Sequence, residues 1–509
     1  MKRGPLKVFY SYAHEDEKVR DRIDEYLELL ARQHLIVRWH DRHILPGSEW
    51  NTSILDALES ADIILLLVSK AFFASKYISQ YEVPAAMQAH QSGKARVVPI
   101  LLESVRGWKK TEFAKLQFLP KGAKPVARWK DPVDAFADIA NGIRKVAKDI
   151  IVAGGGPFEF GPHEFSEAEL AHLPKPERER TASGLERLRK NLNKSIPARG
   201  YESNLLLATW SLRQFGKSTN IPADQNESLL YMAQVISSFD LVALQEVDRN
   251  LKRLRSLTDV LGPDWNVLVS ETAPGNWGNN ERFAILYYTP RVEFRNFSGQ
   301  VILPPKRGVG EKPVLVEQLA RPPLLAAFRS ANYEFQVCSA HILFGGGPSA
   351  SLEEVRKLGK YLSRRSRYEN SDLYLLGSFQ MGKRNSPILD ALIESGIEIP
   401  DETLLPTNIK KNKYFDLIGF APAKKGKIPL SSNRRRVGVF DLFKYVFQDR
   451  NYGQYLDDPA FKKFSRFSRN EPRNKKERER YQKKRFGMWK TYLISDHLPL
   501  WVELDIEKA

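Results

Sequence analysis

The residues best suited to chemistry in the C-terminal part of the chain are carboxylates and imidazoles that follow strand-like segments. Glu246 and His341 each follow an apolar run, and Asp496-His497 stand near the C-terminus. A metal-dependent phosphodiesterase uses these residue types, because carboxylates hold the metal and histidines neutralise the phosphate. It also needs a carboxylate that activates water, but the apolar run that ends at Gly377 is followed by Ser378, which carries only a hydroxyl. We expect this part of the chain to have kept the shape of such a site and lost its reaction.

Strand and helix signals alternate through residues 7–149. Strands are predicted at Lys7–Tyr12, Leu35–His40, Ala61–Ser69 and Arg96–Leu102, and a last helix at Pro132–Lys148. The two later strands are continuous apolar runs, which is typical of strands buried on both faces. This alternation predicts an α/β, flavodoxin-like domain with a parallel sheet and helices on both sides.

Strand signals dominate from Asn204 onward, with helical patterns at 226–238, 350–366 and 386–396 between some of them. This pattern predicts an α/β sandwich, in which two packed sheets are flanked by helices. A glycine-rich break at Ala153–Pro157 and a charged helical stretch separate the two parts. We therefore expect one domain at residues 1–150, a linker with a lead-in helix at 151–200, and a second domain at 201–509.

Four ordered segments in the first domain resemble the Toll/interleukin-1 receptor (TIR) domain family. The last segment contains Glu82, which the resemblance implies is the catalytic carboxylate of an enzyme that cleaves NAD⁺ and releases nicotinamide. Taken alone, a glutamate in this position is more often a surface carboxylate near a helix N-terminus, and the catalytic role depends on the other three segments. The segments are Phe9–Tyr12, Trp39–Asp41 with Ile44–Gly47 and Trp50, Asp62–Ser69, and Ser69–Ser75 with Tyr81–Ala85.

The implied reaction suits a single carboxylate. Cleavage of the nicotinamide–ribose bond builds positive charge on the sugar while nicotinamide leaves neutral, so the carboxylate can supply most of the stabilisation. The ligand crevice of a parallel sheet lies beyond the carboxyl ends of its strands. Trp39 is expected to be a core or anchoring residue. The residues expected to contact NAD⁺ in that crevice are Tyr10, Ser11, Asp41, Ile44 and Trp50.

Seven blocks between about residues 178 and 507 resemble the endonuclease/exonuclease/phosphatase superfamily, whose members hydrolyse phosphate esters with Mg²⁺. The resemblance implies that Glu246 is a metal ligand, that His341 and His497 act on the phosphate, and that Asp496 orients its neighbouring histidine. The blocks are Leu207–Ser211, Leu241–Val247, Gly278–Arg282, Ser339–His341, Gly377–Gln380, Tyr414–Ile418 with Asp416, and Ser495–His497.

Three positions depart from that family's pattern. Ser211 replaces an asparagine, Ser378 an aspartate, and Gln380 an asparagine. Loss of a general base alone costs about 10²–10⁴ in rate, so we expect negligible hydrolysis. Glu246 could still hold Mg²⁺ weakly, although these losses argue against a bound metal. Alternatively, the remaining groups persist as a hydrogen-bonded polar cluster.

The net charge of +18 is unusual and lies mainly beyond residue 150. Residues 1–150 hold 24 basic and 19 acidic side chains, which leaves +13 for the rest of the chain. The basic clusters are Lys424–Lys427, Arg434–Arg436 and Lys462–Arg485. Such a surface attracts polyphosphates by releasing counterions, so we expect contact with nucleic acid or a nucleotide, the alternative being a merely solvated surface.

The bulk sequence is that of a cytoplasmic protein without a membrane span. The longest aliphatic run, Ile63–Val68, is far shorter than the ~20 residues that a membrane helix needs, and no secretory segment is expected. The single cysteine, Cys338, excludes an intramolecular disulfide.

The sequence thus favours a TIR effector that cleaves NAD⁺ in bacterial defence or signalling and acts as a homo-oligomer. The nuclease-like domain would then be a degenerate sensor or assembly module. Two alternatives remain open: an Mg²⁺-dependent nuclease with the TIR domain as its interaction module, and a scaffold without enzymatic activity.

Overall fold

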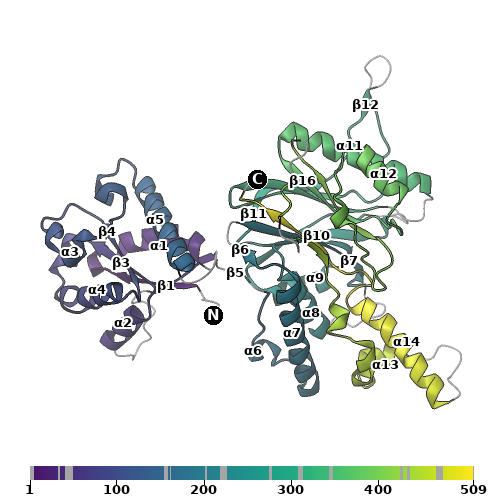
Figure 1. Ribbon diagram of the computed structural model, residues 1–509, viewed down its shortest axis with the longest axis horizontal. Coiled ribbons are helices and arrows are strands. Elements are labelled where there is room, and N and C mark those ends of the chain that lie inside the picture. The colour runs from purple at the N-terminus through teal and green to yellow at the C-terminus, as the bar shows by residue number, and fades with distance from the viewer. Residues whose placement is uncertain are drawn as a thin grey trace. The chain divides into compact units, whose positions relative to one another are not determined.

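The chain folds into two compact units, residues 1–158 and 159–509, in the computed structural model (Figure 1). Each unit is considered by itself. The residues that the structure describes are 5–32, 35–39, 50–153, 159–160, 162–200, 203–217, 226–273, 278–307, 313–342, 348–424, 428–432, 436–465 and 474–507.

The first unit is built on a parallel four-stranded sheet in the order β2-β1-β3-β4. All six residues of β3 are buried, because helices cover both faces of the sheet, as the continuous apolar run predicts. The strands are β1 (Leu6–Ser11), β2 (Ile36–Trp39), β3 (Ile63–Val68) and β4 (Arg96–Leu101).

Five helices surround this sheet. Helices α1 and α5 pack together, and α2 packs on α4, so that the sheet lies between two helical layers (Figure 1). The apolar core beside α2 and α4 includes Phe9, Ile54, Leu66 and Met87. The helices are α1 (Glu17–Arg32), α2 (Trp50–Glu59), α3 (Lys70–Ala74), α4 (Val83–Gln91) and α5 (Pro132–Ala153).

The second unit contains two large sheets. The six-stranded sheet has the order β18-β19-β7-β8-β10-β9, and the five-stranded sheet has the order β11-β14-β15-β16-β17. The strands of the first are β7 (Asn204–Phe215), β8 (Leu241–Asp248), β9 (Trp265–Val269), β10 (Glu281–Tyr288), β18 (Val437–Val439) and β19 (Leu500–Asp505). Those of the second are β11 (Glu293–Gln300), β14 (Leu324–Ser330), β15 (Tyr333–His341), β16 (Asp372–Ser378) and β17 (Asp416–Ala421).

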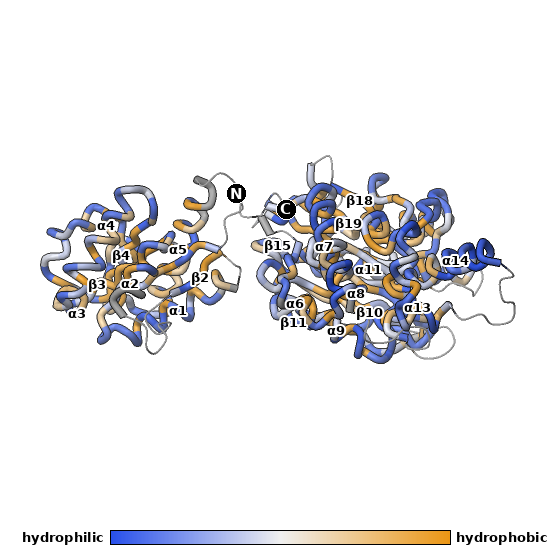
Figure 2. Tube along the Cα trace, turned by 90° about the horizontal axis from the view of Figure 1, so that it is seen from below, coloured by the Kyte–Doolittle hydropathy of each residue, from blue (hydrophilic) through white to orange (hydrophobic). Residues whose placement is uncertain are grey.

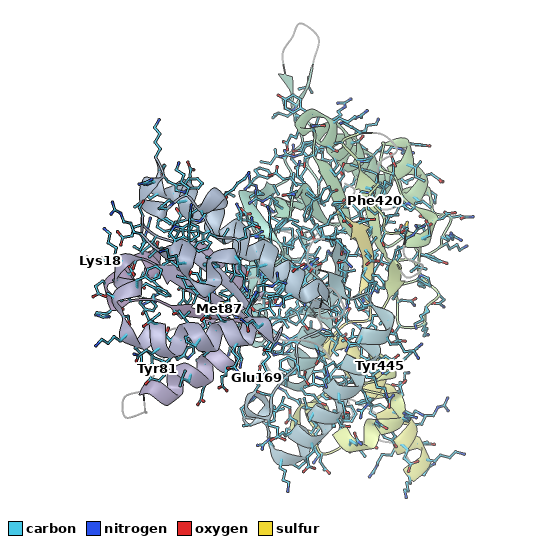
Figure 3. The ribbon with its side chains drawn as sticks, turned by 60° about the vertical axis from the view of Figure 1, so that its left-hand side comes forward. Lys18, Tyr81, Met87, Glu169, Phe420 and Tyr445 are labelled. Atoms are coloured by element: carbon cyan, nitrogen blue, oxygen red, sulfur yellow. The ribbon has the colours of Figure 1, made fainter. Side chains whose placement is uncertain are left out.

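The inner faces of the two sheets form one apolar core. Residues from both sheets, such as Leu207, Phe283, Val337 and Phe420, belong to a single buried cluster, with apolar stretches as orange tube in Figure 2. Phe420 on β17 is also labelled in Figure 3. Two short pairs, β5 (Glu159–Phe160) with β6 (Arg199–Gly200) and β12 (Lys306–Arg307) with β13 (Pro313–Val314), complete the strands.

Helices flank the sandwich. Helices α7, α8 and α9 pack on one another, and α11 packs on α12 over a second apolar cluster on the five-stranded sheet. The sandwich predicted from the strand pattern is thus confirmed. The helices are α6 (Glu167–Leu170), α7 (Lys175–Ser195), α8 (Asn226–Ile236), α9 (Lys252–Leu261), α11 (Pro348–Glu369), α12 (Pro387–Glu394), α13 (Pro459–Phe464) and α14 (Lys475–Leu493).

The helix expected to lead into the second domain, α7, lies within the second compact unit. Its Arg180 binds Glu227 of α8 at 2.8 Å and lies over the Tyr455 ring at 4.3 Å. Tyr231 and Tyr455 also donate hydrogen bonds to the Glu227 carboxylate, at 2.9 and 3.1 Å. Among the described helices, none combines the length and apolarity that crossing a bilayer would require.

Candidate functional site

Glu82 lies at the end of a π-helical turn, Ile78–Glu82, that runs directly into α4. The Val83 N–H donates to the Ile78 carbonyl, and Pro84 has no N–H with which to continue an α-helical ladder. A turn of this kind widens the helix locally and occurs often at functional sites. The Glu82 residue is only 6% exposed, whereas its neighbour Tyr81 is 53% exposed and lies on the outside of the unit (Figure 3).

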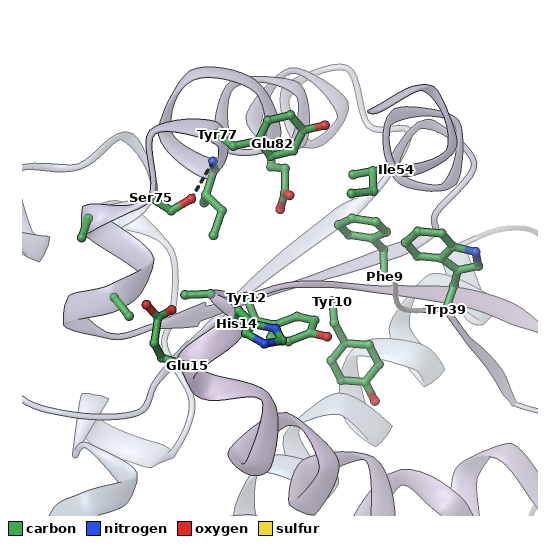
Figure 4. Close-up of a pocket in the computed structure, with 14 residues that line it drawn as sticks. Phe9, Tyr10, Tyr12, His14, Glu15, Trp39, Ile54, Ser75, Tyr77 and Glu82 are labelled. Atoms are coloured by element: carbon green, nitrogen blue, oxygen red, sulfur yellow. Dashed lines mark hydrogen bonds between the residues drawn. The ribbon is translucent and has the colours of Figure 1, made fainter. Parts of the chain in front are cut away.

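The Glu82 carboxylate points into a cavity of about 600 Å³ in the first unit (Figure 4). This volume lies within the range of small-molecule sites. The cavity is framed by the end of β1, the residues that follow it, α2, and the turn that carries Glu82. Its lining residues include Phe9, Tyr10, Tyr12, His14, Glu15, Trp39, Ile54, Ser75, Tyr77 and Glu82.

Aromatic rings form much of the cavity wall. Phe9 and Trp39 stack with their ring centres 5.3 Å apart and their planes 12° from parallel. Tyr12 is held by the Arg20 guanidinium, which lies 5.1 Å from its ring centre. Rings placed in this way suit a flat, aromatic ligand, because stacked aromatic pairs gain energy beyond simple burial.

Of the residues expected to contact NAD⁺, Tyr10 lines the cavity and Ser11 does not. Tyr10 lines the cavity, but its hydroxyl points away from Glu82 and donates to Asp24 at 2.8 Å (Figure 4). Burial and the Asp24 carboxylate together raise the pKa of Tyr10 well above its usual value. Ser11 is fully buried and is not among the lining residues, because β1 is an inner strand of the sheet and its short side chain is covered by the surrounding core. The structure therefore offers no contact between Ser11 and a ligand in this cavity.

The other three residues expected to contact NAD⁺ have side chains outside the part of the chain that the structure describes. Asp41 and Ile44 lie outside the described residues, and Trp50 begins α2 with its side chain outside the description. The sequence analysis did not identify Tyr12, His14 or Tyr77. Tyr12 and His14 directly follow the carboxyl end of β1, which was the available signal.

Tyr77 is brought to the cavity by the turn itself, since it lies five residues before Glu82. Burial raises the pKa of Tyr77, and the neighbouring Glu82 carboxylate adds to the effect. The phenol therefore stays neutral and can act as a hydrogen-bond donor beside the carboxylate.

In the second unit, strand pairing gathers three of the expected side chains at one edge of the five-stranded sheet. His341 on β15 pairs with Ser378 on β16, and Ser378 pairs with Asp416 on β17. Strands β15 and β16 approach closely here, because a Cβ on Gly377 would lie 1.9 Å from the Ala340 carbonyl oxygen. Gln380, in the left-handed region at φ 49°, donates its side-chain amide to the Ser378 hydroxyl at 3.3 Å.

His497 joins the two sheets at this edge. It lies just before β19, and its Nδ1 is 2.8 Å from Oδ2 of Asp416 on β17. Burial opposes a charged imidazole, but the carboxylate of Asp416, with those of Asp496 and Glu246, raises the pKa of His497 to about 9. His497 is therefore a buried cation at neutral pH.

Glu246 has hydrogen-bond partners on strand β7. The Ser211 hydroxyl donates to its Oε1 at 3.0 Å, and the Gln214 N–H approaches its Oε2 at 3.4 Å. Glu246 itself is in the left-handed region, at φ 60°. Backbone strain of this kind in a non-glycine residue is characteristic of functional sites.

His341 forms a separate buried ion-pair group with two residues outside the predicted set. Its Nδ1 lies 2.6 Å from Oε1 of Glu281, and Nε of Arg321 lies 2.9 Å from the same oxygen. Burial alone would raise the pKa of Glu281, but His341 and Arg321 hold it below its usual value. Glu281 belongs to the segment Gly278–Arg282 that carries the family resemblance, but nothing in the sequence indicates that it pairs with His341.

Among the described residues, no group of three acidic, histidine or cysteine side chains lies close enough together to hold a metal ion. Glu246 is hydrogen-bonded to Ser211, and Asp496 lies 3.8 Å from the Arg213 guanidinium. The groups together form a hydrogen-bonded polar cluster with a buried cation, which we call the polar cluster: Ser211, Glu246, Ser378, Gln380, Asp416, Ser495 and His497.

Parts of the chain are similar to known proteins. A family model described as TIR domain matches residues 8–132, so the first unit carries a TIR domain. An uncharacterized protein of Sinorhizobium fredii, y4lF, is 40% identical over 150 residues. The match covers 30% of this chain and 46% of that protein, which is less than half of its length.

Solved structures similar to this chain include endonuclease/exonuclease/phosphatase family proteins. One from Bacteroides thetaiotaomicron is 18% identical with a TM-score of 0.38, covering 59% of this chain and 97% of its own. A mannosyl-6-phosphatase from the same organism is 16% identical with a TM-score of 0.36. The match covers 59% of this chain and 99% of the phosphatase chain. D. rerio TDP2, complexed with a single-strand DNA product, is 14% identical with a TM-score of 0.37. The match covers 60% of this chain and 99% of the TDP2 chain.

Proposed function

We propose that this protein, whose residues 8–132 form a TIR domain, cleaves the bond between nicotinamide and ribose in NAD⁺. In this reaction the bonding electron pair goes to the nicotinamide nitrogen, which becomes neutral. The ribosyl cation that remains takes up water, which then loses a proton, or reacts with another nucleophile of the substrate. The protein must therefore stabilise positive charge on a sugar and bind a flat leaving group.

The observation that carries this proposal is the Glu82 carboxylate, buried and directed into a cavity with aromatic walls. A carboxylate in a site that excludes water stabilises a nearby cation more strongly than it would in bulk solvent. Phe9, Tyr12 and Trp39 offer ring faces for nicotinamide or adenine. Tyr77, whose phenol stays neutral, adds a further aromatic ring to the same cavity.

The second unit serves, in this proposal, as a module that binds or senses without hydrolysis. Its polar cluster contains hydroxyls at positions 211 and 378, and neither can act as a base near neutral pH. His497, with a pKa of about 9, keeps its proton at neutral pH and is thus suited to hold an anion. Homo-oligomerisation and cytoplasmic action remain part of the same proposal.

The test is nicotinamide release by purified wild type, Glu82→Gln and Glu82→Ala, at several protein concentrations, with and without added nucleic acid. Removal of a preorganised charge of this kind costs about 10²–10³ in rate. Glu59→Gln is the matched control, because it removes an exposed carboxylate from the same unit outside the cavity. Full activity in Glu82→Gln, or loss of activity in Glu59→Gln to the same extent, would contradict the assignment.

A further inference from the structure

Helix α14 has an anchored C-terminal half. Phe486, Trp489 and Leu493 are buried, and the Trp489 ring packs 5.2 Å from Phe461 and 5.7 Å from Tyr455. The buried Lys490 ammonium adds an ion pair with Asp449 at 2.6 Å. This half of the helix is held by the second unit in the ordinary way, through apolar burial.

The N-terminal half of α14, residues 475–484, is different, and we call it the basic arm. It projects from the second unit in Figure 1 and is strongly hydrophilic in Figure 2. Six basic and two acidic side chains give it a net charge of +4 over ten residues. None of the six cations forms an ion pair within the described part of the chain. They are Lys475, Lys476, Arg478, Arg480, Lys483 and Lys484, all exposed.

The charges along the basic arm are unbalanced. Lys476 and Arg480, and again Arg480 and Lys484, are like charges four residues apart, whereas Glu479 lies four residues from both Lys475 and Lys483. The Asn474 side chain caps the helix by accepting a hydrogen bond from the Glu477 N–H at 2.9 Å. Two carboxylates among six cations leave an excess of positive charge, which a polyanion lying along the arm would neutralise.

We propose that the basic arm binds the sugar-phosphate backbone of a nucleic acid. The arm is about 15 Å long, and a helix fits the major groove of a duplex, which is about 12 Å wide. A membrane surface is less suitable, because interfacial helices bury a broad apolar face. Over residues 475–484 the one aromatic residue is Tyr481, and the side chains around it are polar or charged.

Arg213 on β7 contacts the anchored half of the same helix, since it donates to Thr491 Oγ1 at 2.7 Å and lies 4.0 Å from the Tyr492 ring centre. Its side chain is partly exposed, so a nucleic acid lying along α14 beyond the basic arm would meet a further guanidinium.

The test uses the full-length chain and fluorescent 30-mer probes of duplex DNA, single-stranded DNA and RNA, titrated between 50 and 300 mM NaCl. The variant is Lys475→Gln, Lys476→Gln, Lys483→Gln and Lys484→Gln combined, because glutamine keeps helix propensity. The matched control combines Lys190→Gln, Lys360→Gln, Lys410→Gln and Lys444→Gln, which removes the same charge from scattered exposed sites of the second unit. Circular dichroism and thermal unfolding verify that both proteins are folded.

We expect salt-sensitive binding by wild type and by the control. On duplex DNA, the negative slope of log K against log [NaCl] should become shallower by up to about 3.6 in the arm variant, since each of the four lost phosphate contacts contributes about 0.9. At 100 mM NaCl the affinity of the arm variant should be at least about 10-fold lower than that of wild type.

Equal weakening of binding in the arm variant and in the control would overturn the proposal, because net charge alone would then explain the binding. Absence of binding to all three probes would also overturn it, as would tighter arm-dependent binding to phosphatidylserine vesicles than to nucleic acid. Basal nicotinamide release is measured in parallel, and the binding result stands whether or not NAD⁺ is cleaved.

Discussion

At neutral pH, replacing Asp416 by asparagine should convert His497 from a charged imidazolium into a neutral imidazole. Asp416 Oδ2 lies 2.8 Å from His497 Nδ1, and both side chains are almost completely buried. The difference between the ordinary histidine pKa of 6.5 and about 9 corresponds to roughly 3 kcal/mol in favour of the charged form. Without Asp416, burial would dominate, and the pKa of His497 should fall below 6.5.

This change has a defined dependence on pH. A pKa that is raised by folding stabilises the folded state below pH 6.5, and that contribution is lost as the pH rises through about 9. The free energy of unfolding of wild type should therefore exceed that of Asp416→Asn by roughly 3 kcal/mol more at pH 6 than at pH 10. A difference that stays constant over this range would contradict the assigned ion pair.

The direct assay is an NMR titration of the nine histidines in the full-length protein. The His497→Gln variant identifies the resonance of His497 by its absence. We expect that resonance to titrate near pH 9 in wild type and below pH 6.5 in Asp416→Asn. A wild-type His497 that loses its proton below pH 7 would refute the reasoning, and with it the view that the polar cluster presents a fixed cation to an anion.

Two further predictions concern the same unit. Combining Ser211→Asn, Ser378→Asp and Gln380→Asn should raise Mg²⁺-dependent hydrolysis of a p-nitrophenyl phosphodiester by about 10²–10⁴ over the wild-type background, because it supplies a base at position 378, an amide at position 211 and a shorter amide at position 380. An unchanged rate would mean that more than these three side chains separates the polar cluster from an active site. Gly184→Ala should lower the free energy of unfolding by about 1–3 kcal/mol in urea, because its Cβ would lie 2.3 Å from the Tyr231 hydroxyl oxygen. Adding Tyr231→Phe should recover part of that loss, and a fully stable Gly184→Ala would contradict the close packing of α7 on α8.

Much of the fold could be predicted from local patterns. The apolar run Ile63–Val68 forms the fully buried strand β3, and the alternation around it yields the parallel sheet. In the second unit, the strand signal that begins at Asn204 is the start of β7, which continues to Phe215. Of the strands in the two large sheets, β9, β11 and β18 were not predicted. Strand β11 lies at the edge of its sheet with most residues exposed, and so carries little of the periodicity that marks a buried strand.

The candidate sites were predicted less completely. Trp39 was expected to be a core or anchoring residue, and it lines the cavity while stacking on Phe9. Tyr77 reaches the cavity through a π-helical turn, which local sequence patterns do not predict. The pairing of His341 with Glu281 joins residues 60 positions apart, so nothing in either neighbourhood indicates it.

The sequence by itself determined the two kinds of domain, the position of Glu82, and the presence of a hydroxyl instead of a carboxylate at Ser378, because each depends on residue types in short, ordered segments. Only the tertiary structure decided that Glu82 faces an aromatic cavity, that Ser11 is buried away from it, and that Asp416 makes a cation of His497. The physical reason is that burial and electrostatic environment are set by groups distant in sequence. Local patterns therefore specify which side chains are present, and packing specifies what each of them can do.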